Sequence, residues 1–153
     1  MVAINGLTFQ RKDGSLVEAS DALADCSKIA LYFSAHWCPP CRKFTPALKD
    51  FYEEVNDGQK QVEIVFVSAD KSEEEMVDYH NEMGDWLRIP FSQEELRERI
   101  RDHYGKKTCS KTGDLIRSGI PCLVVIDRDH NVKTYDGVAD IQALGSMALE
   151  MKW

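Results

Sequence analysis

Two apolar runs separated by one amphipathic segment constrain the fold of this chain more than any other feature. Residues 29–35 and 62–68 are nearly continuous runs of apolar, largely β-branched and aromatic side chains of strand length. Such runs are typical of strands buried on both faces of a sheet. Between them, apolar side chains recur at the spacing of a helix face: Phe44, Ala47, Leu48, Phe51, Tyr52 and Val55. Strand, helix and strand in this order predict an α/β fold.

Weaker patterns predict the elements on either side of this unit. Asp13-Gly14 lies between two short apolar runs and predicts an N-terminal β-hairpin. Ser72 with Glu75, and later Ser92 with Glu95, have the spacing of a helix capping box. Residues 122–127 and 132–135 predict an antiparallel strand pair, and a last helix is expected to bury Ile141, Leu144, Ala148 and Met151 on one face. The order predicts one domain over residues 1–153, with a mixed sheet and helices on both faces.

Charge and hydropathy exclude several classes of function. The chain of 153 residues carries 19 basic and 26 acidic side chains, a net charge of −7, whereas nucleic-acid binding depends on clustered Lys and Arg. No apolar run approaches the roughly 20 residues of a membrane span, and the first residues lack the basic region and apolar core of a secretory signal. We expect a monomer in the cytoplasm, with access to the nucleus by size, and neither nucleic-acid nor membrane partners.

The cysteines need an explanation other than structural disulfides. Their number, five, is odd and their density low, which excludes a small secreted disulfide framework. In a reducing compartment a close pair such as Cys38 and Cys41 is catalytic or metal-binding rather than structural. A structural zinc site normally has four ligands, and no second Cys-x-x-Cys or His-x-x-His motif follows. No metal is therefore predicted.

The position of this pair, between a buried strand and an amphipathic helix, predicts redox chemistry. Backbone N–H groups and the positive end of the dipole at a helix start stabilise a thiolate. Cys38 is therefore the expected nucleophile, and Cys41, one helical turn later, is the expected resolving thiol. Pro39 and Pro40 between them stiffen the turn, so less entropy is lost when the pair closes to a disulfide.

Trp37 to Cys41 in a strand-to-helix turn, with Ile120-Pro121 entering a later strand, resembles the thioredoxin superfamily. The resemblance implies a three-layer α/β/α sandwich with a central mixed sheet. It implies that Pro121 is cis and packs against the redox pair, while its neighbours, such as Ile120, offer backbone groups to the substrate. It further implies a thiol:disulfide oxidoreductase that reduces protein disulfides without a bound cofactor. Electrons would come from an external dithiol or reductase, either thioredoxin reductase with NADPH or the glutathione system.

Further segments narrow the resemblance to the tryparedoxin and nucleoredoxin branch: residues 32–35, 44–46, 67–70 and 86–91. Tyr32 stands where ordinary thioredoxins carry a buried acid, so the motif assigns no proton acceptor to Cys41. Ala69 and Lys71 stand where tryparedoxins have a tryptophan and an acid, which favours nucleoredoxin-like proteins. The resemblance to nucleoredoxin-like proteins suggests an alternative function, a redox-gated module that binds a signalling partner.

Residues around the pair have two interpretations each. His36 either adds positive charge that favours the Cys38 thiolate or is an exposed histidine without a role. Trp37 is expected to form a wall of the site and to shield the thiols. Cys122, next to Pro121, is either a small packing residue or an auxiliary thiol. Asp70 lies either at the rim of the site or in solvent.

The segment before Ile120 is longer than this family usually has, and residues 106–119 look like an inserted loop beside the site. From Arg97 to Arg117 there are seven basic and three acidic residues, opposite in sign to the whole chain. The loop either selects an acidic partner or is simply solvated. Cys109 within it is expected to be exposed. A further alternative is a stress-responsive protein that uses Cys109 or Cys122 as an additional redox element.

Overall fold

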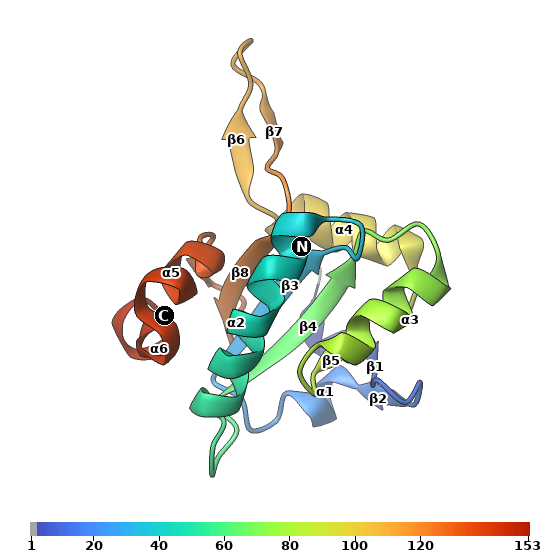
Figure 1. Cartoon of the computed structure of the whole chain (residues 1–153), viewed down its shortest axis with the longest axis vertical. Helices are drawn as coiled ribbons and strands as arrows, with labels where there is room; N and C mark the ends of the chain where they lie inside the picture. Colours follow the sequence, from blue (N-terminus) through green and yellow to red (C-terminus); the bar gives the residue numbers. More distant parts are fainter. Residues whose placement is uncertain (1–2) are drawn as a thin grey trace.

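The computed structural model describes residues 3–153. The predicted domain begins at Met1, and the N-terminal segment in which no secretory signal was found begins there too. Met1 and Val2 therefore lie outside the described residues. Figure 1 shows the elements, which follow one another in this order: η1 (Ile4–Gly6), β1 (Thr8–Gln10), β2 (Leu16–Glu18), α1 (Ala19–Ala22), β3 (Lys28–Ser34), α2 (Pro39–Val55), β4 (Val62–Ser68), α3 (Glu73–Glu82), β5 (Leu87–Arg88), α4 (Glu94–Tyr104), β6 (Lys107–Cys109), β7 (Leu115–Arg117), β8 (Cys122–Asp127), β9 (Val132–Thr134), α5 (Gly137–Leu144), η2 (Gly145–Met147) and α6 (Ala148–Met151).

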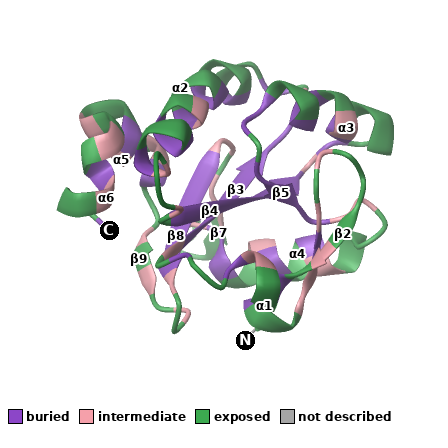
Figure 2. Ribbon diagram, turned by 90° about the horizontal axis from the view of Figure 1, so that it is seen from below, coloured by how far each residue is buried: buried purple, intermediate pink, exposed green. Residues whose placement is uncertain are grey.

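A mixed sheet of seven strands forms the middle layer, in the order β2-β1-β5-β4-β3-β8-β9. The central strand β3 pairs in parallel with β4 and antiparallel with β8. In Figure 2 helices α2, α3, α5 and α6 cover one face of this sheet, and α1 and α4 cover the other. The predicted three-layer α/β/α sandwich with an N-terminal hairpin, β1–β2, is therefore confirmed.

The two apolar runs form the central strands because helices cover both of their faces. Successive side chains of a strand point to opposite faces. Tyr32 and Phe66 accordingly pack on the α2 side, whereas Leu31 and Val65 pack on the α4 side. Both faces need apolar side chains, which explains why these runs are continuous rather than alternating.

Helix boundaries agree with the sequence patterns in part. Ser72 caps α3 by accepting a hydrogen bond from the Glu75 N–H, as predicted. The second capping pattern is wrong, because α4 follows Gln93 without a side-chain cap and Ser92 lies outside it. The C-terminal helix is interrupted at Gly145, whose φ of 56° suits glycine. This break leaves Met151, predicted to be buried, 59% exposed.

Residues 106–119 contain a hairpin rather than an irregular loop. Strands β6 and β7 pair in register, Lys107 with Arg117 and Cys109 with Leu115, as a separate two-stranded sheet. The turn uses Gly113 at a φ of 88°, and the Gly113 N–H donates to the Ser110 carbonyl. Figure 1 shows this hairpin standing out from the sandwich. That the segment is an insertion relative to the family remains a prediction.

Within residues 3–153, no helix is both long enough and apolar enough to cross a bilayer.

Candidate functional site

The Cys38 and Cys41 side chains meet where β3 leads into α2. Cys38 is the residue immediately before the helix, and its Sγ accepts a hydrogen bond from the Cys41 N–H at 3.4 Å. The Cys38 thiol also lies 3.8 Å from the Ile120 carbonyl oxygen, to which it donates. The Ile120–Pro121 peptide bond is cis, as the family resemblance implies. Antiparallel pairing of β3 with β8 brings these two segments together across the sequence.

The two thiols of the pair differ in environment. Cys41 is completely buried, whereas Cys38 retains 5% of its surface. Burial raises the pKa of Cys41 well above its usual range, and the contact with the Cys38 side chain raises it further. A hydrogen bond with the Ser34 side chain acts in the opposite direction but does not outweigh burial. Cys41 therefore remains a thiol at neutral pH, while Cys38 is the thiol that reaches the surface.

A chain of buried hydroxyl groups lies behind Cys41 and was not found from the sequence. Ser34 Oγ is 2.8 Å from Tyr79 Oη, which is 2.7 Å from Thr45 Oγ1. Thr45 Oγ1 is in turn 2.8 Å from Tyr32 Oη and donates to the Cys41 carbonyl at 2.9 Å. The sequence feature that could have indicated these hydroxyls is a polar residue at a position expected to be buried. Ser34 ends an apolar strand, and Thr45 lies on the buried side of α2. The hydroxyls occupy the side of Cys41 that faces the interior.

No carboxylate belongs to this chain of hydroxyls. Burial raises the pKa of both Tyr32 and Tyr79, so both phenols remain neutral at physiological pH. Tyr32 thus has a defined place in the site, within hydrogen-bond distance of the Cys41 carbonyl at 3.3 Å. Within this chain of hydroxyls, the Ser34 side chain forms the hydrogen bond with the Cys41 thiol.

Asp70 holds the loop that precedes Cys38. Its carboxylate accepts hydrogen bonds from the His36 N–H at 2.7 Å and from the Ser68 hydroxyl at 2.8 Å. The adjacent Ala69 carbonyl accepts from Trp37 Nε1 at 3.1 Å. Asp70 is 6% exposed, which excludes the solvated interpretation, and burial raises its pKa. The two residues after β4 therefore hold the His36 backbone and the Trp37 indole, just before Cys38.

His36 and Trp37 cover the outer side of the site. The His36 ring lies against Tyr79, with ring centroids 5.7 Å apart. Trp37 is 53% exposed, so its indole presents an apolar surface to solvent while its N–H is bound. Whether the charge of His36 favours the Cys38 thiolate remains a prediction.

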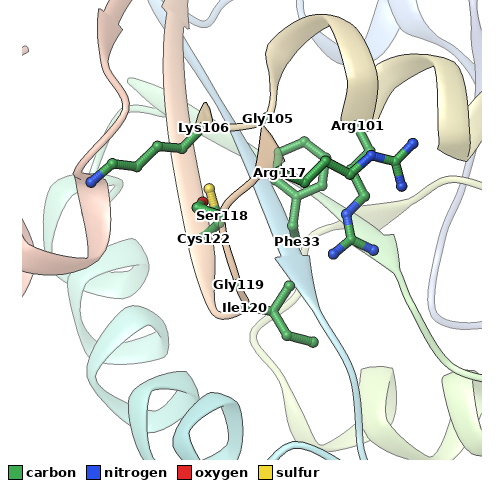
Figure 3. A pocket seen from close by; sticks show the side chains of 9 residues that line it. All are labelled: Phe33, Arg101, Gly105, Lys106, Arg117, Ser118, Gly119, Ile120 and Cys122. Atoms are coloured by element: carbon green, nitrogen blue, oxygen red, sulfur yellow. The ribbon is translucent and has the colours of Figure 1, made fainter. Parts of the chain in front are cut away.

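The other cysteines lie outside the pair's environment. Cys122 is buried on the α4 side with Phe33, in a different cluster from Cys38 and Cys41, and burial raises its pKa. Figure 3 shows its sulfur at the root of the hairpin, beside Ser118. This placement agrees with a packing residue. Cys26 is buried with its pKa raised to about 11, and Cys109 is exposed.

Among the described residues, 3–153, no group of three or more His, Cys, Asp or Glu side chains is arranged to hold a metal ion.

Comparison with known proteins defines the class. A family model described as thioredoxin-like matches residues 27–132. Nucleoredoxin from Mus musculus is 37% identical over 131 residues, which are 86% of this chain and 27% of that protein. The crystal structure of thioredoxin from Wuchereria bancrofti superposes with a TM-score of 0.77 at 44% identity, covering 94% of this chain and 90% of that one. Tryparedoxin I from Leishmania major gives a TM-score of 0.78 at 28% identity, covering 97% and 92%.

The fold and these matches define a thioredoxin-like protein. The chain belongs to the thioredoxin superfamily, in its nucleoredoxin and tryparedoxin branch. It spans about a quarter of the length of the curated nucleoredoxin that it matches, 27%.

Proposed function

We propose that this protein reduces disulfide bonds of other proteins by cycling Cys38 and Cys41 between dithiol and disulfide. The Cys38 thiolate attacks one sulfur of the substrate disulfide, a mixed disulfide forms, and the other substrate sulfur leaves as a thiolate. Cys41 then attacks Cys38 Sγ, which releases the second substrate sulfur. The substrate gains two electrons and two protons, and the Cys38–Cys41 disulfide holds the oxidising equivalents.

The unequal environment of the two thiols is the observation that carries this assignment. Cys38 lies at the start of α2, where its sulfur already accepts a backbone N–H and where negative charge is stabilised. Cys41 is buried, with a raised pKa, and no substrate reaches it directly. A nucleophile that retains some contact with solvent, as Cys38 does at 5% exposure, and a fully shielded resolving thiol are the two roles that the exchange reaction needs.

The residues around Cys38 are proposed to position the substrate. Once Cys38 is in a mixed disulfide, the Ile120 carbonyl, beside cis Pro121, no longer receives the Cys38 thiol proton and can accept an N–H of the substrate chain. Trp37 offers an exposed apolar wall. Pro39 and Pro40 occupy the first turn of α2, where missing N–H groups cost little and the restricted backbone keeps the sulfurs close.

The hydroxyl chain is proposed to stabilise the Cys41 thiolate as it forms. With Cys41 protonated, its S–H can donate to Ser34, Ser34 to Tyr79, and Tyr79 to Thr45, which donates to the Cys41 carbonyl. When Cys41 ionises, rotation of the hydroxyls lets Ser34 donate to the sulfur and Tyr79 donate to Ser34. The same oxygens therefore serve both states, and the Cys41 proton goes to the substrate sulfur that is released from Cys38.

Replacing Ser34 by alanine is expected to slow the release step about tenfold, because one hydrogen bond to a developing charge contributes about 1.5–3 kcal/mol. The measurement is single-turnover release of reduced product from a preformed mixed disulfide, followed against pH. The pH at which release reaches half its maximum should rise, since the Cys41 thiolate loses its donor.

Tyr79→Phe is the matched control for this variant. It removes the partner of Ser34 in the same buried chain but keeps the Ser34 hydroxyl beside Cys41. Its release rate should stay within about threefold of the wild type, whereas its stability should fall by a similar amount to that of Ser34→Ala. Equal release rates in Ser34→Ala and the wild type would rule out this role.

Replacing Cys41 by serine is expected to trap substrates, since the mixed disulfide on Cys38 then lacks its resolving thiol. A stable adduct with an oxidised protein such as insulin should appear on a non-reducing gel and disappear with dithiothreitol. Cys38→Ser/Cys41→Ser should form none. Absence of adducts with Cys41→Ser would contradict the order of attack, and identification of trapped proteins would give the physiological substrates.

Reducing equivalents are proposed to come from an external dithiol, or from thioredoxin reductase with NADPH or the glutathione system. The protein is proposed to act as a monomer in the cytoplasm, with access to the nucleus by size. Family membership favours this enzyme over a redox-gated module that binds a signalling partner. Turnover separates the two: catalytic reduction of insulin with dithiothreitol supports the enzyme. A partner affinity that changes on oxidation, without turnover, would support the module.

A further inference from the structure

The β6–β7 hairpin leads directly into the proposed site. Strand β7 ends at Arg117, and three residues later the chain reaches Ile120, whose carbonyl lies 3.8 Å from Cys38 Sγ. Figure 1 shows the hairpin standing clear of the sandwich, near the N-terminal end of α2, which begins directly after Cys38. A protein substrate whose disulfide reaches Cys38 therefore has the hairpin beside it.

Ion pairs fix the root of the hairpin to the body of the protein. Arg117 pairs with Glu98 at 2.8 Å and with Asp102 on helix α4, and Lys106 pairs with Asp136 just before α5. In Figure 3 the Lys106 and Arg117 side chains leave the root in opposite directions. The root is thus contacted from both sides, by α4 and by the residue that precedes α5.

The ribbon presents apolar side chains to solvent. Leu115 is 73% exposed and Ile116 is 48% exposed. As neighbours in one strand they point to opposite faces of the ribbon. Both strands of a two-stranded ribbon are edges, and an edge strand offers backbone N–H and C=O groups to a further strand. Apolar side chains combined with free edges are features of surfaces that bind extended peptide segments.

The charge of the ribbon is opposite to that of the whole protein. Residues 106–117 contain four basic side chains and one acidic one, whereas the chain has a net charge of −7. Lys106 and Arg117 are used in the ion pairs of the root, but Lys107 and Lys111 are exposed along the ribbon. A basic surface on an acidic protein favours acidic partners.

A groove connects the ribbon to the cis proline. Its volume is about 280 Å³, and its lining includes Thr108 of β6, Ser118, Pro121, Tyr135 and Gln142. The groove therefore extends from the root of the hairpin past Pro121 towards α5. A chain that binds beside Pro121 can continue along it to the ribbon.

We propose that the hairpin and this groove form a docking site for an extended acidic segment of the substrate protein, close to the disulfide that Cys38 attacks. Apolar side chains of the segment contact Leu115 or Ile116, and its carboxylates approach Lys107 and Lys111. The inference rests on the proposed function, since it names the substrate class of that site.

Binding without chemistry tests the docking site. The probes are two synthetic peptides with the same apolar residues and one internal disulfide, flanked by glutamates in one and by lysines in the other. Fluorescence anisotropy with Cys38→Ser/Cys41→Ser should show about tenfold tighter binding of the acidic peptide. The preference should largely disappear in about 0.5 M salt, where exposed charges are screened.

Hairpin variants on the same background assign the effect. Lys107→Glu/Lys111→Glu should abolish or reverse the preference, and Leu115→Ser/Ile116→Ser should weaken both peptides. The matched control is Lys28→Glu/Arg128→Glu, which changes the charge equally at the opposite end of β3 and β8. It should leave the preference unchanged. Equal binding of the two peptides, or an equal loss in the control, would overturn the docking site.

A small substrate separates this inference from the proposed function. With both cysteines present, the wild type and every hairpin variant should reduce hydroxyethyl disulfide at equal rates, because this molecule is too small to reach the ribbon. If the wild type reduces neither hydroxyethyl disulfide nor insulin, the proposed function fails even where the acidic peptide binds. If all proteins reduce both peptides at the same rate, the docking site fails and the proposed function stands.

Discussion

Replacing Cys38 by serine is expected to lower the reduction of insulin disulfides by at least about 10³-fold. A serine hydroxyl does not ionise near neutral pH, and catalysis by exchange requires an ionised sulfur. Cys41 cannot take over, because it is completely buried and burial keeps its pKa high. Turnover should be measured with dithiothreitol as reductant, at matched protein concentrations.

Cys109→Ser is the matched control for this loss. Cys109 is an exposed thiol on the hairpin, so its replacement should leave turnover within about twofold of the wild type. Thiol titration after mild peroxide treatment adds a second readout, in which two thiols should be lost, mapping to Cys38 and Cys41. Retention of a tenth or more of the activity by Cys38→Ser would remove it as the nucleophile. Loss of further thiols would support a redox role for Cys109 or Cys122.

The stability of the protein is expected to fall by about 3 kcal/mol between pH 7 and pH 4 through a single buried histidine, His80. Its Nε2 lies 2.8 Å from the Trp86 carbonyl, and its Nδ1 lies 2.8 Å from Arg88 Nη1. The carbonyl can only accept and the guanidinium can only donate, so the ring is neutral with its proton on Nε2. Burial, together with the nearby Arg88 charge, lowers the pKa of His80 to about 4.

The sign follows from proton binding. The unfolded chain protonates this histidine near its ordinary pKa of about 6.5, while the folded protein resists protonation until about pH 4. The stabilising contribution is therefore complete above pH 6.5 and is lost as the pH falls towards 4. Glu63 and Asp70, whose pKa values burial raises, act in the opposite direction, so the effect of His80 must be isolated by comparison.

His80→Gln provides that comparison, because its amide supplies a donor and an acceptor but does not titrate. Urea unfolding of both proteins at pH 7 and pH 4, followed by tryptophan fluorescence, gives the difference. The wild type should lose about 3 kcal/mol more than the variant over this interval. A difference smaller than about 1 kcal/mol would show that His80 does not control the acid sensitivity.

Much of the fold was predictable because the strongest patterns are local. The runs at β3 and β4 and the face of α2 need only the side-chain periods of strand and helix. Ser72 caps a helix by contacts within four residues. The prediction of one continuous C-terminal helix failed at Gly145. Its positive φ interrupts the helix between α5 and α6, and Met151 is exposed instead of buried.

By itself the sequence predicted the type of chemistry that we propose. Two cysteines at the start of a helix after a buried strand, followed later by Ile-Pro, predict disulfide exchange, since the helix start stabilises a thiolate whatever surrounds it.

Only the tertiary structure decided how unlike the two thiols are and what surrounds them. Anchoring of the loop by Asp70 joins residues that are far apart in the sequence, and the burial of Cys41, with its contact to Ser34, depends on how α2 packs onto the sheet. The basic segment before Ile120 was visible as composition. That it is a ribbon held by two sets of ion pairs beside the proposed nucleophile depends on how α4, β8 and α5 pack together, which no local pattern encodes.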